Sequence, residues 1–299
     1  MGGGRLGRIL ALSLAAALLA QETPIRVDVR LVRLLVNVKD QNGGLVGSLT
    51  QDAFAIRDSG APQTISVFER TTSQPLSISL LVDTSGSTAK DLKFEIAAAA
   101  RFLKAITREG HPEDALALYT FNHDTALVSN FTRNPSRITR ALQALTAEAG
   151  TSLYDALVLS SERTQDRDGR HVLIVISDGG DTTSRYDYHA ALKSLHRADG
   201  ILYPIVIQPI TNDAGRNIGG ENALIQLAAS TGGKTFFASD GPALDDAFST
   251  ILRDLRTQYL IGYYPRNLPA AARGAFRKVE VLLNDPKLRA STRGGYYEE

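Results

Sequence analysis

Residues 76–87 read LSISLLVDTSGS, a mostly apolar run that ends in an aspartate, a threonine, two serines and a glycine. A helical stretch follows at 88–107, so the pattern predicts a strand buried on both faces that leads directly into a helix. A second apolar run at 171–176 leads into SDGGD in the same way. Such strands, alternating with helices, predict an α/β fold with a mostly parallel, doubly wound sheet covered on both sides.

The rest of the central segment continues this alternation. Strands at 115–121 and 125–131 are separated by a short AsnHisAsp turn, which predicts an antiparallel hairpin. The other expected elements are helices at 135–146, 152–165, 186–198, 221–230 and 242–256, and strands at 201–207 and 234–237. We therefore expect one α/β domain over 76–256.

The two flanks have a different character. Residues 25–70 alternate apolar and polar side chains in strand fashion, and strand-like segments return at 258–265 and 277–283. Neither flank alone has enough strands to be stable. We therefore expect 24–72 and 257–299 to pair into one smaller β-sandwich domain, with two separate flaps on the α/β domain as the competing arrangement.

The amino terminus has the pattern of an export signal. Arg5 and Arg8 precede a 12-residue apolar run from Ile9 to Ala20, which is typical of a secretory signal peptide and short for a membrane span. An N-terminal core helix is the alternative. A signal peptide at 1–20, with no later apolar stretch of membrane-spanning length, predicts an exported protein that is periplasmic, cell-surface or secreted.

Composition excludes several classes of function. The 33 basic and 32 acidic side chains give a formal charge of +1, so nothing favours nucleic acid as the main partner. The absence of cysteine excludes disulfides, thiolate metal sites and a cysteine nucleophile. The segment ASTGGKT at 229–235 ends like a phosphate-binding loop, but it follows a helix where such a loop must precede one.

Oxygen-bearing side chains stand at three junctions between expected strands and helices. In a doubly wound sheet, ligands collect beyond the carboxyl ends of the strands, where the strand order reverses. The loops after 76–82 and 171–176 meet there if those two strands are neighbours. The candidate metal ligands at these junctions are Asp83, Ser85, Ser87, Thr151 and Asp178.

These residue types suit a hard divalent cation. Carboxylate and hydroxyl oxygens favour Mg²⁺ or Mn²⁺. Asp83, Ser85 and Ser87, spaced two residues apart, can curl around one ion, with Gly86 permitting the tight turn. Two aspartates leave the coordination sphere incomplete, so water or an Asp or Glu carboxylate from a partner protein would complete it.

Other interpretations of the same residues remain open. Each junction alone can be structural, because Asp, Ser and Thr cap helices and SDGGD can be a simple turn. As an alternative function, Asp83 would be the nucleophile of a Mg²⁺-dependent phosphoryl-transfer hydrolase, with Asp178 on the metal. That chemistry usually uses a second carboxylate two residues on, where this chain has Ser85. A metal-free structural scaffold is the third possibility.

Together the motifs resemble a known family. DTSGS at 83–87, Thr151 in AGTSLYD and Asp178 in ISDGGD resemble the metal-ion-dependent adhesion site (MIDAS) of von Willebrand factor A (VWFA) domains. The resemblance covers about 76–256 and all five site positions match. It implies a Rossmann-like sheet (the vWA fold), bound Mg²⁺ or Mn²⁺, binding of a protein ligand through its acidic residue, and no catalytic activity.

The flanks and loops add weaker signals. VNVKDQNGGLV and LIGYYP are similar to segments of a secreted acidobacterial group of VWFA-related proteins. Arg185, Tyr186 and Tyr188 are candidate contact residues on the rim of the site, because aromatic and arginine side chains are favoured interface anchors. We expect Asp181 behind the ligands or on the same rim.

Overall fold

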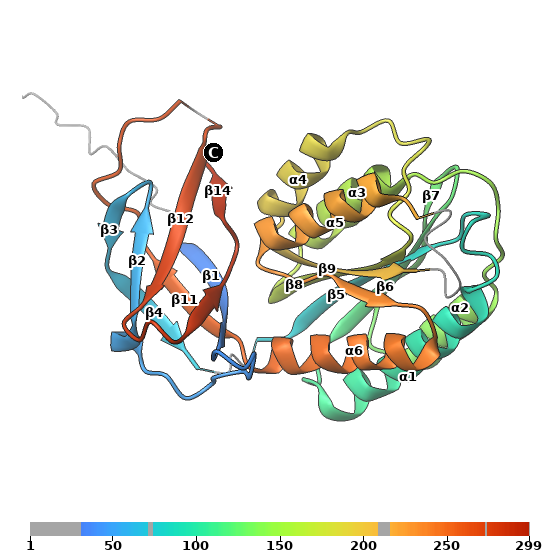
Figure 1. Cartoon of the computed structure of the whole chain (residues 1–299), viewed down its shortest axis with the longest axis horizontal. Helices are drawn as coiled ribbons and strands as arrows, with labels where there is room; N and C mark the ends of the chain where they lie inside the picture. Colours follow the sequence, from blue (N-terminus) through green and yellow to red (C-terminus); the bar gives the residue numbers. More distant parts are fainter. Residues whose placement is uncertain (1–30, 71–73, 209–215, 273, 299) are drawn as a thin grey trace, which may run out of the picture.

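The computed structural model describes residues 31–70, 74–208, 216–272 and 274–298, which form two packed units (Figure 1). The expected signal segment at 1–20 and the strand pattern at 25–30 lie outside these residues. Among the described residues, no helix combines the length and apolar character needed to cross a membrane.

The larger unit is built on a six-stranded sheet. Its strand order is β10-β9-β8-β5-β6-β7, and all neighbouring pairs are parallel except β6 with β7. Its elements are β5 (Leu76–Asp83), α1 (Leu92–Glu109), β6 (Ala115–Phe121), β7 (Thr125–Thr132), α2 (Pro135–Gln143), α3 (Leu153–Gln165), β8 (Arg170–Ser177), α4 (Tyr188–Arg197), β9 (Gly200–Ile207), α5 (Ile218–Thr231), β10 (Phe236–Ala238) and α6 (Gly241–Arg256). The predicted α/β class is confirmed.

Helices cover this sheet on both faces (Figure 1). Side chains of α1, α2 and α6 form one core cluster with alternate strand residues, and side chains of α3, α4 and α5 form the other. Every residue of β5, β8 and β9 is buried. Each buried Leu, Ile or Val contributes about 1.5–3 kcal/mol relative to an exposed one, so these strands dominate the packing of the unit.

The smaller unit is a β-sandwich made from both ends of the described chain. One sheet has the order β13-β1-β11-β4 and the other β14-β12-β2-β3. The strands are β1 (Val32–Lys39), β2 (Phe54–Asp58), β3 (Ala61–Gln63), β4 (Ile65–Glu69), β11 (Tyr259–Tyr263), β12 (Phe276–Leu283), β13 (Arg289–Ser291) and β14 (Gly295–Tyr297). Since β1 pairs with β11 and β2 with β12, the predicted discontinuous sandwich is confirmed and separate flaps are excluded.

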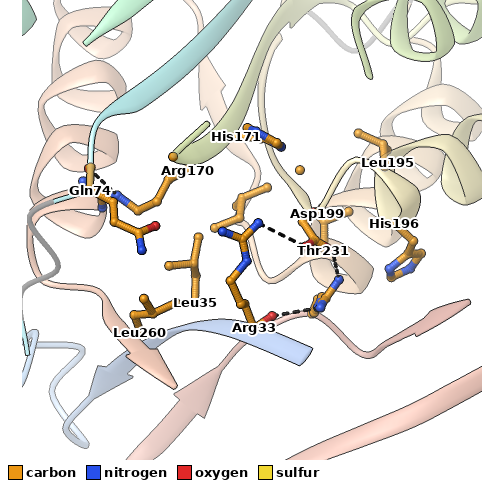
Figure 2. Close-up of a pocket in the computed structure, with 14 residues that line it drawn as sticks. Arg33, Leu35, Gln74, Arg170, His171, Leu195, His196, Asp199, Thr231 and Leu260 are labelled. Atoms are coloured by element: carbon orange, nitrogen blue, oxygen red, sulfur yellow. Dashed lines mark hydrogen bonds and ion pairs between the residues drawn. The ribbon is translucent and has the colours of Figure 1, made fainter. Parts of the chain in front are cut away.

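The sandwich packs against the amino edge of the six-stranded sheet. Gln74, Gly169 and Asp199, at the starts of β5, β8 and β9, line a pocket together with Arg33 and Arg293 of the sandwich unit (Figure 2). The guanidinium of Arg293 pairs with Asp199 and donates to the carbonyl oxygen of Arg33 at 2.8 Å. The carboxyl edge of the sheet lies at the opposite ends of the parallel strands, away from the sandwich.

Sequence and structure differ mainly at helix ends. The predicted hairpin is present as β6 and β7. The helix expected from 88 begins at Leu92, because the Thr88 hydroxyl donates to the carbonyls of Asp83 and Ser85 and closes a turn first. The helix expected over 135–146 ends at Gln143. The segment at 229–235 ends α5, with Gly232 in the left-handed region at φ 83°, which agrees with setting aside a phosphate-binding loop.

Asp58 joins the two sheets of the sandwich and provides a test of this unit. Its buried carboxylate accepts hydrogen bonds from the Tyr263 hydroxyl at 2.9 Å and the Tyr296 hydroxyl at 2.8 Å. Asp58→Ala should lower the free energy of unfolding by about 2–4 kcal/mol, because both hydroxyls lose their acceptor. Ser59→Ala, which removes a third donor at the adjacent turn, should cost less than about 1 kcal/mol. Denaturant unfolding measures both; an unchanged midpoint for Asp58→Ala contradicts the assignment.

Candidate metal site

The carboxyl ends of β5 and β8 bring the candidate residues to one edge of the sheet. The two strands pair in parallel, with Val82 opposite Ile176, so Asp83 and Ser177 follow side by side. β6, the next strand in sequence, lies on the other side of β5. The strand order therefore reverses at β5, which is the position where doubly wound sheets place their ligands.

The loop after β5 is held in a compact curl. One carboxylate oxygen of Asp83 accepts from the Ser85 amide at 2.8 Å, and the other accepts from the Ser177 hydroxyl at 2.5 Å. The Ser85 and Ser87 hydroxyls lie 3.0 Å apart. Asp83 and Ser85 are buried, whereas Gly86 and Ser87 are exposed. The loop thus gathers three oxygen-bearing side chains and opens to solvent at Ser87.

Thr151 is fixed from two sides. Gly150, at φ 85°, packs so closely against His123 that a Cβ on the glycine would lie 2.8 Å from the His123 Cα. The Thr151 amide donates to the Thr182 hydroxyl at 3.0 Å, and the Thr182 amide donates back to the Thr151 carbonyl at 2.8 Å. The N-cap of α3 is Ser152, so the structural explanation of Thr151 as that cap is wrong.

Asp178 lies at the same edge as Thr151 and Asp83. Its carboxylate accepts from the Gly180 amide at 2.9 Å. A Cβ placed on Gly180 would lie 3.1 Å from a carboxylate oxygen of Asp178 and 4.0 Å from the Thr151 hydroxyl oxygen. The charge of Asp178 also acts on Asp83. The loops that carry Asp83, Thr151 and Asp178 thus converge at one edge of the sheet.

Burial perturbs the acid at the centre of this edge. Burial raises the pKa of Asp83 from 3.8 to about 6, hydrogen bonds from Ser177 and Ser85 oppose the rise, and the charge of Asp178 adds to it. A buried carboxylate with a raised pKa is stabilised by a nearby cation. The donor set consists of carboxylate and hydroxyl oxygens, so its chemistry fits a hard divalent ion.

Two further residues at this edge have roles that spacing alone does not reveal. Ser177 anchors Asp83, but in sequence it is simply the last residue of an apolar strand. Asp181 accepts from the Tyr154 amide at 3.2 Å, so it caps the start of α3 behind Thr151 rather than pointing outward as a rim residue. Both support the loops that carry the candidate ligands.

Comparison with protein families identifies the unit that carries the site. Residues 78–180 match the von Willebrand factor type A domain. Over this range the α/β unit is similar to a von Willebrand factor type A domain. The match begins within β5, ends after β8 and includes all five candidate residues.

Solved structures show distant similarity to this chain. BatB from Bacteroides thetaiotaomicron is 15% identical, with a TM-score of 0.49, over 60% of this chain and 98% of that chain. The vWF domain of the type V pili tip protein Mfa5 from Porphyromonas gingivalis is 15% identical, with a TM-score of 0.49, over 67% of this chain and 99% of that chain. A comparison with curated proteins finds no match.

The loop between β8 and α4 carries Asp178 and continues to the candidate contact residues. The amides of Arg185 and Tyr186 both donate to the Asp155 carboxylate at 2.9 Å, and both side chains are exposed. Tyr188 instead is partly buried and packs edge-on against Tyr154, with ring centroids 6.5 Å apart. Of the three candidate contact residues, Arg185 and Tyr186 are thus the accessible ones.

The raised pKa of Asp83 predicts a pH dependence for the metal-free A domain. Because the folded-state pKa of about 6 exceeds 3.8, this residue stabilises the fold at low pH and loses that contribution as the pH rises through 6. The loss is of the order of 3 kcal/mol. In chelator, Asp83→Asn should flatten the stability profile between pH 4 and 7, as measured by denaturant unfolding. A profile as steep as that of the wild type contradicts the assignment.

Gly150 predicts how sensitive the Thr151 loop is to backbone change. Gly150→Ala should lower the melting temperature, because alanine disfavours φ 85° and its Cβ would clash with His123. Gly60→Ala is the matched control: that residue has the same φ of 85°, but open space surrounds its Cβ position. Calorimetric melting should show the larger fall for Gly150→Ala. Equal falls would mean that the close approach to His123 carries no cost.

Proposed function

We propose that Asp83, Ser85, Ser87, Thr151 and Asp178 form a metal-ion-dependent adhesion site that binds Mg²⁺ or Mn²⁺. The single observation that carries this proposal is the convergence of three loops, distant in sequence, on one edge of the sheet. Asp83, Thr151 and Asp178 would hold the ion together with the serine hydroxyls. The bound ion would supply positive charge and an open coordination position.

That open position is the basis for protein binding. Two aspartates balance the charge of a divalent cation and leave an octahedral ion short of protein ligands. The exposed Gly86 and Ser87 leave this side of the loop accessible to a partner. An Asp or Glu carboxylate of a partner protein is a hard oxygen donor and would complete the coordination. The chain would then act as a divalent-cation-dependent, adhesion-type protein-binding module.

The arrangement of the two units suits such a module. The β-sandwich packs at the amino edge of the sheet, so the carboxyl edge faces away from it (Figure 1). A partner can therefore approach the proposed ion without displacing the sandwich. Arg185 and Tyr186, exposed on the loop after β8, are the proposed contacts beside the ion.

We further propose that the protein is exported, on the signal-like pattern of residues 1–20.

We propose no catalytic activity for this site. A phosphoryl-accepting Asp83 would have to be reached by substrate, yet its carboxylate is buried, with one oxygen bonded to Ser85 and the other to Ser177. Ser85 also occupies the position where such chemistry usually has its second carboxylate.

The direct test of metal binding is thermal unfolding in Mg²⁺ and in chelator. The wild-type chain should melt at a higher temperature in Mg²⁺, because an ion that binds only the folded state stabilises it by about 2.7 kcal/mol at one hundred times its Kd. Asp83→Ala should abolish this increase. Asp114→Asn alters a buried carboxylate at the amino edge of the same sheet and should retain it. A wild type that melts identically in Mg²⁺ and chelator contradicts the proposal.

A further inference from the structure

Glu95 is a buried acid that the five-residue motif does not use. It stands in the first turn of α1, directly after the loop that carries Asp83 and Ser87, and is 1% exposed. Within the described part of the chain, neither of its carboxyl oxygens has a hydrogen-bond partner. A buried carboxyl group left without a donor or cation is costly, so its retention calls for a partner that protein atoms do not provide.

Other buried acids in the described residues are satisfied. Asp58 accepts from two tyrosine hydroxyls, Asp114 accepts from backbone amides, and Glu221 pairs with Arg216. Asp254 lies 3.5 Å from the Lys39 ammonium group. Glu95 differs from all of these because neither of its oxygens has a donor among the described residues.

The surroundings of Glu95 place its carboxyl group near the proposed metal site. Its pKa is raised well above 4.5, first by burial and then by the negative charges of Asp83, Asp91 and Asp178. Two of these three acids are proposed ligands, and α1 follows the loop that carries Asp83, so the buried carboxyl group lies within electrostatic reach of the site. A divalent ion there would offset the repulsion among these carboxylates.

Direct coordination by all three acids does not fit the geometry. The residues described here contain no group of three or more His, Asp or Glu side chains placed to hold one ion. Mg²⁺ usually keeps several of its water molecules, however, and carboxylates beyond the direct ligands accept hydrogen bonds from such waters. Both oxygens of Glu95, which have no donor in the part of the chain that the structure describes, can serve this purpose.

We propose that Glu95 is a third carboxylate of the metal site, which accepts hydrogen bonds from water bound to the divalent ion. The inference rests on the proposed metal-binding function and adds a positioning residue on α1 to the five loop positions. It also explains why an acid is retained at a buried position in the first turn of α1.

Titration calorimetry of the full chain with MgCl₂ and with MnCl₂ tests this role. Glu95→Gln keeps the size of the side chain and removes its charge, and it should weaken binding of both ions by roughly 10–100-fold. In chelator the same variant should melt no lower than the wild type, since it removes a buried unpartnered acid. A merely structural role would give the reverse pattern: a lower melting temperature in chelator with unchanged ion affinity.

The outcomes separate this inference from the function on which it rests. Wild-type affinity in Glu95→Gln, with binding abolished in Asp83→Ala, overturns the role of Glu95 and leaves the proposed function intact. A wild type that binds neither ion overturns the proposed function itself. An equal loss of affinity in Asp114→Asn would trace the effect to general damage and also overturns the inference.

Discussion

The parallel pairing of β5 with β8 is the constraint on which the rest of the structure depends. The pairing runs without a shift from Leu76 opposite Arg170 to Val82 opposite Ile176. This register places the Ser177 hydroxyl on the Asp83 carboxylate and brings both acidic loops to one edge. A slip of one residue would turn the side chains of a fully buried strand to the wrong face, so packing of both core clusters fixes the register and, with it, the site.

The second unit is organised around the same sheet but at its other end. Both flanks of the described chain return to the amino edge and interleave into two four-stranded sheets. Charged contacts such as Arg293 with Asp199 join the units there. The sandwich is therefore attached at one edge of the six-stranded sheet, and the candidate metal site lies at the opposite edge.

Much of this organisation could be predicted from the sequence. Apolar strands that lead to Asp83 and Asp178 carry a strong local signal, and the condition that these two strands are neighbours is met. Helix ends were less predictable, because the Thr88 side chain closes a turn that delays α1 by four residues relative to the expected start. Side-chain bonds of this kind depend on tertiary placement.

The residues that support the site could not be predicted from the sequence, because their roles also depend on tertiary placement. Ser177 and Glu95 carry no motif, since one ends an apolar strand and the other lies in an amphipathic helix. Their importance appears only when Ser177 is seen to hold Asp83 and when Glu95 is found buried without a donor. Sequence spacing can identify the residues that would touch an ion, but it does not reveal what orients them.

The most direct test of the central claim is a crystal of the chain grown with Mn²⁺ and measured at the manganese absorption edge. We expect an anomalous peak among the oxygen atoms of Asp83, Ser85, Ser87, Thr151 and Asp178, at the carboxyl edge of the sheet. A well-ordered site with no peak there, or with manganese bound only at unrelated surface carboxylates, would contradict it.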